Sequence, residues 1–461
     1  MSHAYAQTNS TPATQALRVM VNGRLYDVGT WRRYTLVFFA ATLSSTVVLK
    51  IGDVQYLEVI FAADLLVLGA LLPFDGFCVR IFRPFLEIAK SYAIFLGCAF
   101  VLSLFALDQS FATWFHSSFL KAPILVTLAR MAELSLDAFY MLYLGCIFRK
   151  DERLCLFGAR TYFWAGIAGC VYSFITLPLN LLFDAQLGTY TTLHRFRGFD
   201  NEGGGFGLYL LSVMLLTVVM YRRAWLSRRQ LYVGGAVLAA GFAGSQSKSA
   251  YAAIALSGVI VMVWFVQGRK RWFVLFGLVA GFIVLTSLFN IGEQVDQYRI
   301  GRDRYQELSN LRSEDGNFVM GRVAGAVLAP RMIAARPLLG IGWGNYPLVR
   351  DDAEYRRGTA FAIAPLDAPS LGVIDYIVEL GIPLWMYLTW VELKPVFMLH
   401  RIRSDPWLIA LALIQPVSNW AGAHLNLIHP WVAAAFALGL AYRPGLPETL
   451  LPEDADSVRS G

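Results

Sequence analysis

Charged side chains are scarce in this chain. Only 15% of its 461 residues are Asp, Glu, Lys or Arg, whereas soluble domains average about 25%. Hydrophobic residues make up 57% of the chain, and they recur in stretches of the length that crosses a bilayer. The bilayer rather than water is therefore the expected solvent, and the composition predicts an all-α polytopic membrane protein.

Cysteine is also sparse, and its spacing shows no pattern. The five cysteines include no C-x-x-C pair, and no histidine joins them at metal-ligand spacing. We therefore expect no disulfide framework, no metal site and no cofactor. The first 30 residues lack an apolar segment behind a basic start, so we expect no cleavable signal peptide, and the first span must direct insertion.

Hydropathy indicates about twelve membrane-spanning helices, each near the length of about 20 apolar residues that a bilayer requires. The predicted spans are 34–49, 54–73, 91–107, 122–147, 157–183, 204–220, 231–245, 249–267, 272–290, 371–393, 406–420 and 424–441.

The loops between these spans differ in charge. Every second loop carries a cluster of arginine or lysine, and the alternation holds through all twelve spans. The basic loops contain Arg18, Arg24, Arg32, Arg33; Arg80, Arg83, Lys90; Arg149, Lys150, Arg153, Arg160; Arg222, Arg223, Arg228, Arg229; Arg269, Lys270, Arg271; and Arg401, Arg403. By the positive-inside rule, both termini are cytoplasmic.

This topology divides the chain into five parts. They are a cytoplasmic N-terminal tail (1–33), helices 1–9 (34–290), a large, partly helical outward loop (291–370), helices 10–12 (371–441) and a cytoplasmic C-terminal tail (442–461).

The large loop contains ten arginines and no lysine. The arginine fork matches phosphate or carboxylate with two hydrogen bonds, which favours recognition of an anionic substrate. The alternative is a solvated loop, because Asp and Glu residues balance much of this charge.

A glycine-rich segment, "RPLLGIGWGNY" at 336–346, lies inside this loop. Its spacing is G-x-G-x-G, whereas a dinucleotide loop needs G-x-G-x-x-G between a strand and a helix. Its outward position also excludes a nucleotide role. We expect the glycines to end a helix at 318–335 and to let the backbone fold tightly against the bilayer surface or the substrate.

Several charged residues fall inside the predicted spans, where charges are costly and usually face the bundle interior. Arg130, Glu133 and Asp137 share one face of span 4. Asp64 lies near the middle of span 2, and Asp375 and Glu379 form an i, i+4 pair in span 10. Arg130 has two candidate partners, Asp64 and Glu133, in what is either a structural pair or part of a site.

Four segments resemble the signature regions of one family. "RFRGFDNEGGGFGLYL" at 195–210 and "SQSKSAYAAIAL" at 245–256 precede "GRVAGAVLAPRMIAARPLLGIGWGNY" at 321–346 and "DYIVELGIPLW" at 375–385. Their order and their predicted side of the membrane are similar to those of the O-antigen polymerase and ligase superfamily. The resemblance implies a GT-C-like membrane fold with its large loop between helices 9 and 10.

Two positions depart from that pattern. Ser370 stands where the ligases carry a histidine, and Lys248 stands where the family carries an arginine. The missing histidine favours the polymerase branch (Wzy-type) over the ligases.

The resemblance implies a metal-independent, inverting glycosyltransferase of the bacterial inner membrane, with its active face in the periplasm. It would move glycan from one undecaprenyl-diphosphate-linked oligosaccharide to another, to build an exopolysaccharide or O-antigen. The expected partners are this lipid-linked substrate, the bilayer, and chain-length regulator and flippase proteins, with no nucleic acid.

Cations that face the leaving diphosphate are expected to stabilise its developing charge. The candidates are Arg197, Lys248, Arg322 and Arg130. Interfacial snorkelling is the alternative for Arg197, and a helix-end anchor is the alternative for Lys248.

The acceptor hydroxyl also needs a base, for which carboxylates and histidine are the usual groups. The candidates are Asp367, His194 and Asp375, with Glu202 as a further possibility, and Asp367 is closest to the ligase histidine position.

Three other functions fit parts of the pattern. One is an O-antigen ligase that transfers glycan to lipid A-core. Another is a lipid-linked oligosaccharide flippase or transporter, although the two halves show no repeat of the kind that transporters often contain. The third is a peptidoglycan-type polymerase of the shape and division family, which usually has fewer spans.

Overall fold

The structure is a computed structural model that is mainly helical. It describes residues 18–21, 24–46, 50–51, 54–71, 81–105, 123–183, 185, 187–189, 194–200, 203–265, 324–349, 352–356, 372–420 and 427–443. Two short antiparallel hairpins accompany the helices: β1 (Arg18–Val21) with β2 (Arg24–Asp27), and β3 (Lys50–Ile51) with β4 (Val54–Gln55).

The helices of the first half run up and down in sequence. They are α1 (Val28–Leu43), α2 (Tyr56–Leu71), α3 (Arg83–Leu104), α4 (Pro123–Lys150), α5 (Glu152–Phe183), α6 (Gly203–Arg222), α7 (Arg228–Ser245) and α8 (Lys248–Phe265). The later helices are α13 (Ala324–Ala335), α14 (Tyr346–Val349), α15 (Ala353–Arg356), α16 (Val373–Arg401), α17 (Pro406–Trp420) and α18 (His429–Ala441).

Helices α1–α8 and α16–α18 coincide with eleven of the predicted spans, and the span at 272–290 lies outside the described residues. By length and composition, α3, α4, α5 and α6 can each cross a membrane. The chain is therefore a helical membrane protein, as its composition predicts.

Some helices begin earlier than the hydropathy pattern predicts. Helix α1 begins at Val28 rather than 34, and α3 begins at Arg83 rather than 91. Both extensions contain charged residues that hydropathy excludes from a span. In α3, Pro84 lies at the first turn, where proline is favoured because its missing N–H has no intrahelical partner.

Helix α18 lies in the centre of the bundle. All of its residues are buried, and it packs against α4, α6 and α17. Small residues allow the close approach of α4. A Cβ at Gly439 would lie 3.0 Å from the carbonyl oxygen of Gly145, so the two backbones are almost in contact. Seams of small residues are typical of helix packing in membranes.

The basic ends of the helices are joined at one end of the bundle. Arg222 at the end of α6 pairs with Asp405 before α17 (2.7 Å), and Arg443 after α18 pairs with Glu152 of α5 (2.9 Å). Arg223 donates to the carbonyl of Leu440 (3.1 Å). We call this the basic end.

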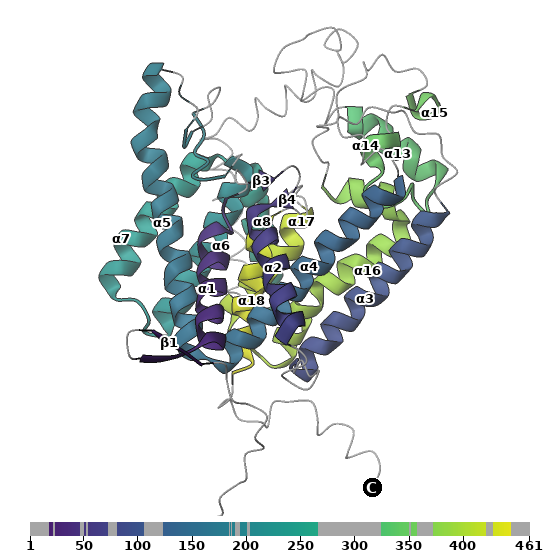
Figure 1. Cartoon of the computed structure of the whole chain (residues 1–461). Coiled ribbons are helices and arrows are strands. Elements are labelled where there is room, and N and C mark those ends of the chain that lie inside the picture. The colour runs from purple at the N-terminus through teal and green to yellow at the C-terminus, as the bar shows by residue number, and fades with distance from the viewer. Residues whose placement is uncertain are drawn as a thin grey trace, which may run out of the picture.

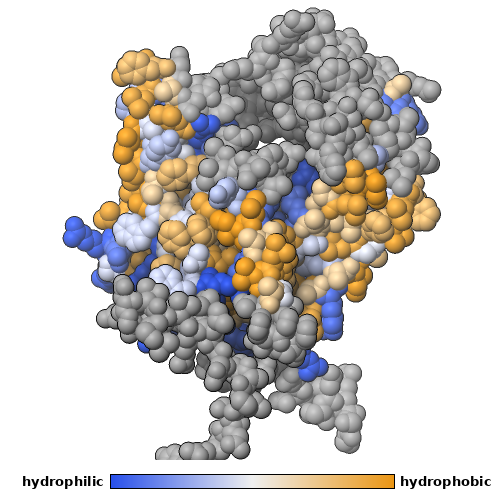
Figure 2. Space-filling view, viewed as in Figure 1, coloured by the Kyte–Doolittle hydropathy of each residue, from blue (hydrophilic) through white to orange (hydrophobic). Residues whose placement is uncertain are grey.

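Helices α13–α15 lie at the opposite end, away from hairpin β1–β2 (Figure 1). The space-filling view shows apolar side chains over the middle of the outer helices (Figure 2). Among them, Leu66 of α2 is 76% exposed and Ile94 of α3 is 57% exposed. Apolar surface of this extent would be unfavourable in water and is expected against lipid.

Candidate functional site

The glycine segment after α13 adopts the backbone conformation that its sequence predicts. Gly340, Gly342 and Gly344 have φ angles of 66°, 91° and 79°, a region that is costly for residues with a side chain. Helix α13 ends at Ala335, and the amide of Gly340 donates to the carbonyl of Arg336 (3.1 Å). The predicted helix end at 335 is therefore confirmed, and the glycines shape the turn that follows it; residues 318–323, where the predicted helix begins, lie outside the described residues.

This glycine loop (residues 337–345) packs against α16 at Gly381, where the helix is broken. The amides of Ile341 and Gly342 donate to the carbonyls of Val378 and Glu379, each at 3.0 Å. In return, Ile382 of α16 donates to the carbonyl of Pro337 (2.9 Å). The loop thus satisfies backbone groups that the broken helix leaves without intrahelical partners.

Glycine is required on both sides of this contact. Gly381, at the break, has a φ of 71° and a ψ of 164°. A Cβ at Gly340 would overlap the backbone of Glu379, and one at Gly381 would overlap that of Leu338. The glycines of this loop therefore pack against protein backbone, a contact that the sequence did not predict.

Helices α3 and α4 hold the other side of the glycine loop. The amide of Trp343 donates to Ser103 Oγ (3.2 Å), and its carbonyl accepts from Thr127 Oγ1 (2.8 Å). The Trp343 side chain is 1% exposed and packs edge-on against Phe95, with ring centroids 5.3 Å apart. The loop is thus fixed among three helices.

A charged cluster lies beside this loop. Arg130 of α4 pairs with Glu133 (2.9 Å) and also interacts electrostatically with Glu379 and Tyr376 of α16. Glu379 accepts a hydrogen bond from the amide of Tyr346 (3.2 Å). Arg130, Glu133, Glu379 and Asp375, which is buried one turn before Glu379, form what we call the α4–α16 charged cluster.

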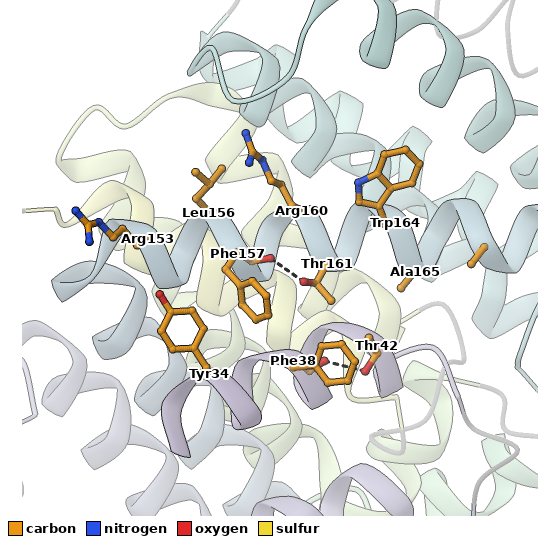
Figure 3. A pocket seen from close by; sticks show the side chains of 11 residues that line it. Tyr34, Phe38, Thr42, Arg153, Leu156, Phe157, Arg160, Thr161, Trp164 and Ala165 are labelled. Carbon is orange, nitrogen blue, oxygen red and sulfur yellow. Dashed lines mark hydrogen bonds between the residues drawn. The ribbon is translucent and has the colours of Figure 1, made fainter. Parts of the chain in front are cut away.

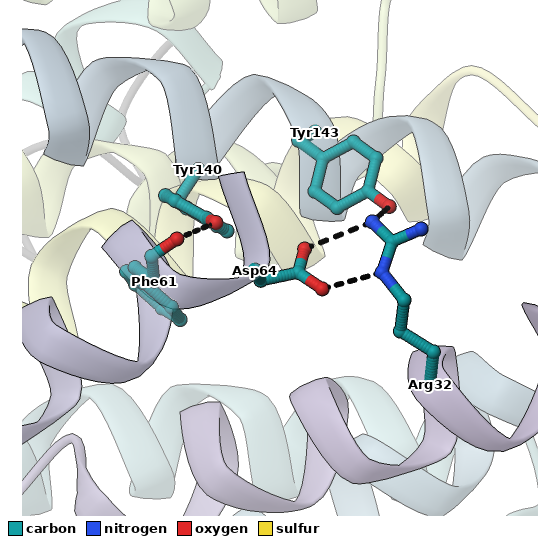
Figure 4. A network of polar contacts seen from close by, with 5 residues as sticks. All are labelled: Arg32, Phe61, Asp64, Tyr140 and Tyr143. Carbon is teal, nitrogen blue, oxygen red and sulfur yellow. Dashed lines mark hydrogen bonds and ion pairs between the residues drawn. The ribbon is translucent and has the colours of Figure 1, made fainter. Parts of the chain in front are cut away.

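The choice between the two predicted partners of Arg130 is settled by Figure 4, because Asp64 pairs with another arginine. Arg32 of α1 contacts both oxygens of Asp64, at 2.5 and 3.1 Å, and also donates to the hydroxyl of Tyr143 (2.9 Å). A pairing of Arg130 with Asp64 is therefore wrong. The Arg32–Asp64 pair joins α1, α2 and α4, and it has a structural role.

A second cluster surrounds residues 194–200, between α5 and α6. The backbone amide of Arg197 donates to the carbonyl of Gly188 (2.9 Å), and its Nε donates to that of Leu187 (2.7 Å). Gly198, with a φ of 56°, donates its amide to Ser173 Oγ (3.0 Å). The Arg197 side chain is thus hydrogen-bonded to the segment just before its own loop.

This arginine loop (residues 194–200) also contacts the break between α7 and α8. Phe196 donates its amide to the carbonyl of Gly244 (2.8 Å), and Arg195 Nε donates to that of Ser245 (3.1 Å). Gln246 reverses the chain with a φ of 47°. Ser247 Oγ then donates to the carbonyl of Gly204 (2.9 Å) and accepts from the amide of Ala250, which caps α8.

The candidate residues therefore fall into two groups at the end opposite the basic end. Arg130 and Asp375 belong to the α4–α16 charged cluster. His194 and Arg197 belong to the arginine loop, and Lys248 is the first residue of the adjoining α8.

Of the candidates for the base, only His194 and Asp375 lie within the described residues. His194 is exposed, has a φ of 48°, and its Nδ1 lies 2.6 Å from Asn180 Oδ1. Asp367, Glu202 and Ser370, like the cation candidate Arg322, lie outside the described residues. Within the described part of the chain, no group of three or more His, Cys, Asp or Glu side chains is arranged to hold a metal ion.

Two arginines have positions that the sequence pattern did not assign. Arg195 lies beside the start of α8, and its place in the same "RFR" motif as Arg197 was the available signal. Arg331, in contrast, is one of the ten loop arginines and donates to the carbonyl of Tyr355 (2.8 Å), so it holds α15 against α13. At least one loop arginine thus has a structural contact.

Residues 233–389 match the family described as O-Antigen ligase. This match covers about a third of the chain and supports the predicted resemblance to the superfamily of O-antigen ligases and polymerases. The matched region includes most of α7, all of α8, the glycine loop and the break in α16. No curated protein matches the chain.

Proposed function

We propose that this chain is a periplasm-facing polymerase that transfers glycan between undecaprenyl-diphosphate-linked oligosaccharides. The observation that supports it most is the set of backbone hydrogen bonds between the glycine loop and α16, which lies inside the region that matches the O-Antigen ligase family. Ser370 in place of the ligase histidine favours the polymerase branch.

The proposal includes the full topology. Twelve spans cross the bacterial inner membrane, both termini are cytoplasmic, and residues 291–370 lie in the periplasm. The basic end, joined through Arg222 and Arg443, is then the cytoplasmic end. A flippase would supply the substrate to the periplasmic side, and a chain-length regulator would act on the product.

In the proposed reaction, the acceptor hydroxyl attacks the anomeric carbon of the donor glycan. The bond from this carbon to the diphosphate oxygen breaks, and the lipid diphosphate leaves with the electron pair. A protein base takes the hydroxyl proton. Inversion at the anomeric carbon follows from this single displacement.

The leaving diphosphate gains negative charge, and nearby cations would stabilise it. Arg197 is our first candidate because its loop is held in place by backbone hydrogen bonds, which fixes the position of a cation before substrate binds. Lys248 begins the adjoining helix, and Arg322 and Arg130 complete the proposed set. Asp367 is our first candidate for the base, before His194 and Asp375.

The experiment uses the purified chain in detergent with lipid-linked repeat units, without added nucleotide or divalent metal. We expect longer glycan chains, because the diphosphate bond already carries the energy of transfer. Unchanged substrate length in every condition would instead favour a transporter, and transfer only to lipid A-core would identify a ligase. Activity that is lost with EDTA and restored with magnesium would contradict the metal-independent reaction.

Variants then test the assigned residues. Arg197→Ala should lower the rate at least about a hundredfold, the usual effect of removing one stabilising donor. Arg197→Lys should be partly active, because it keeps the charge but not the fork. Arg228→Ala, at the basic end, is the matched control. Among the bases, Asp367→Asn should be more damaging than His194→Ala, and the reverse order would reverse the assignment.

A second candidate function is the ligase reaction, since the matched family is described as O-Antigen ligase. It would use the same donor and the same cations, and only the acceptor would differ. Adding lipid A-core to the assay therefore separates the two reactions directly.

A further inference from the structure

A groove of about 710 Å³ lies on the outer surface of the bundle, between α1 and α5. No residue of the α4–α16 charged cluster or of the arginine loop lines this groove. Figure 3 shows Tyr34 and Phe38 from α1 next to Phe157 from α5, and Trp164 on the side of α5 that carries Arg160.

Next to this groove, α1 and α5 pack closely against each other. Gly158 of α5 lies against Val37 of α1, where an added Cβ would be 2.7 Å from Val37 Cγ1. Tyr34 and Phe157 meet edge-on, with ring centroids 5.2 Å apart. Beyond this line of contact the groove opens outward, where Phe38 is 45% and Trp164 is 54% exposed. Its wall is therefore aromatic and open to the surroundings of the bundle.

Two arginines line the same groove at the basic end. Arg153 and Arg160 are both exposed and lie seven residues apart on α5, hence on the same face. Arg160 uses one nitrogen to donate to the carbonyl of Trp225 (3.3 Å). Among the described residues, the Arg153 guanidinium has no hydrogen-bond or ion-pair partner. The groove thus combines an apolar wall with positive charge at one end.

The neighbouring carboxylates do not neutralise these arginines. Glu152 pairs with Arg443, which follows α18 (2.9 Å). Asp151 accepts hydrogen bonds from the backbone amides of Arg153 and Leu154, at 2.9 and 3.1 Å, and so caps α5. An anion at this position would therefore be held by the two guanidinium groups and not by the helix terminus.

The dimensions favour an amphiphile that lies along the helix. The lining residues of α5 extend from Arg153 to Ala168, which at 1.5 Å per residue is a length of about 22 Å. Such a length accommodates an acyl chain along the aromatic wall while its anionic head group stays beside the arginines. Basic pockets between helices at the cytoplasmic side are suited to anionic lipid head groups.

We propose that this groove binds an anionic phospholipid, with its phosphate at Arg153 and Arg160 and an acyl chain against Phe157 and Trp164. This site is independent of the glycan transfer reaction, and it requires only that the bundle spans a bilayer.

The test uses the full chain in vesicles that contain lipids with brominated acyl chains, which quench tryptophan fluorescence on contact. The contribution of Trp164 is the difference between the wild-type chain and the Trp164→Phe variant. We expect brominated phosphatidylglycerol to quench this contribution at a lower mole fraction than brominated phosphatidylcholine. Each arginine should account for about a fivefold difference in apparent affinity.

The double variant Arg153→Gln/Arg160→Gln should remove the preference for phosphatidylglycerol. The pair Arg228→Gln/Arg229→Gln at the start of α7 is the matched control and should keep it. High salt should weaken the preference in the wild-type chain, which needs no variant.

Three outcomes would overturn the proposal. Equal quenching by both lipids would mean that only bulk lipid contacts the groove. An equal loss of preference in the control pair would indicate a general effect of surface charge. The absence of Trp164 quenching by either lipid would mean that another occupant, such as the N-terminal residues of the chain, fills the groove.

Discussion

The contact between the glycine loop and α16 is tested most directly by Gly340→Ala. A Cβ at this position would lie 2.5 Å from the carbonyl carbon of Glu379 and 2.6 Å from the amide nitrogen of Gly381. Both are backbone atoms, so no flexible side chain can move aside. The φ of 66° adds a cost of about 1–2 kcal/mol for any residue that carries a Cβ.

Together these effects should detach the loop from α16 or strain it by about 2–4 kcal/mol. The hydrogen bonds of Ile341 and Gly342 to α16 would be weakened with it. We therefore expect a lower midpoint of thermal denaturation in detergent, faster hydrogen exchange in residues 340–346, and loss of polymer formation.

Gly97→Ala in α3 is the matched control, because no atom lies within 4 Å of a Cβ there. It should leave stability unchanged or raise it slightly, since alanine favours a helix by about 1 kcal/mol over glycine. The double variant Gly340→Ala/Gly381→Ala should cost less than the sum of the single variants, because both disturb one contact. Wild-type stability and activity in Gly340→Ala would refute the account of this contact.

Three further predictions follow from other parts of the bundle. Arg32→Ala should lower the free energy of unfolding by about 3 kcal/mol, because it leaves Asp64 buried without its partner. The double variant Arg32→Met/Asp64→Leu should recover most of this loss, and additive effects of the two substitutions would contradict the pairing. Thr127→Val should lower the free energy of unfolding by about 1 kcal/mol, because it removes a buried hydrogen bond to the glycine loop. Thr127→Ser keeps the hydroxyl and should be neutral, and an equal loss of stability in the two variants would exclude that hydrogen bond as the cause. The topology can be tested in a chain whose native cysteines are replaced by serine, in cells whose outer membrane has been made permeable. A membrane-impermeant thiol reagent should then label Gly316→Cys but not Ser227→Cys. The opposite labelling would invert the topology.

The sequence predicts those features that depend on local chemistry. The glycine spacing at 340–344 predicts a tight backbone segment after a helix, and all three residues have positive φ. Hydropathy predicts the span 406–420, and α17 has these bounds because Pro406 begins it and its residues are almost all apolar. The i, i+3 spacing of Arg130 and Glu133 predicts their ion pair, since both lie on one face of α4.

Features that depend on distant segments could not be predicted. Arg32 and Arg130 both had the charge to pair with Asp64, and only the packing of α1 against α2 decides between them. The two hydrogen bonds that hold Trp343 come from Ser103 and Thr127, whose positions in sequence carry no sign of that contact. Helix starts were misplaced for a related reason, because a charged residue with a partner can continue a span.

The central position of α18 has a consequence for how the protein is made. This helix is the last of the described helices, yet it occupies the middle of the bundle, with all its residues from His429 to Ala441 buried. The helices that surround it leave the ribosome earlier, and domains generally begin to fold from the N-terminal side during synthesis. Until residues 429–441 have been synthesised, the earlier helices must therefore keep an opening for this segment, and a ribosome that stops before residue 429 leaves a bundle without its centre.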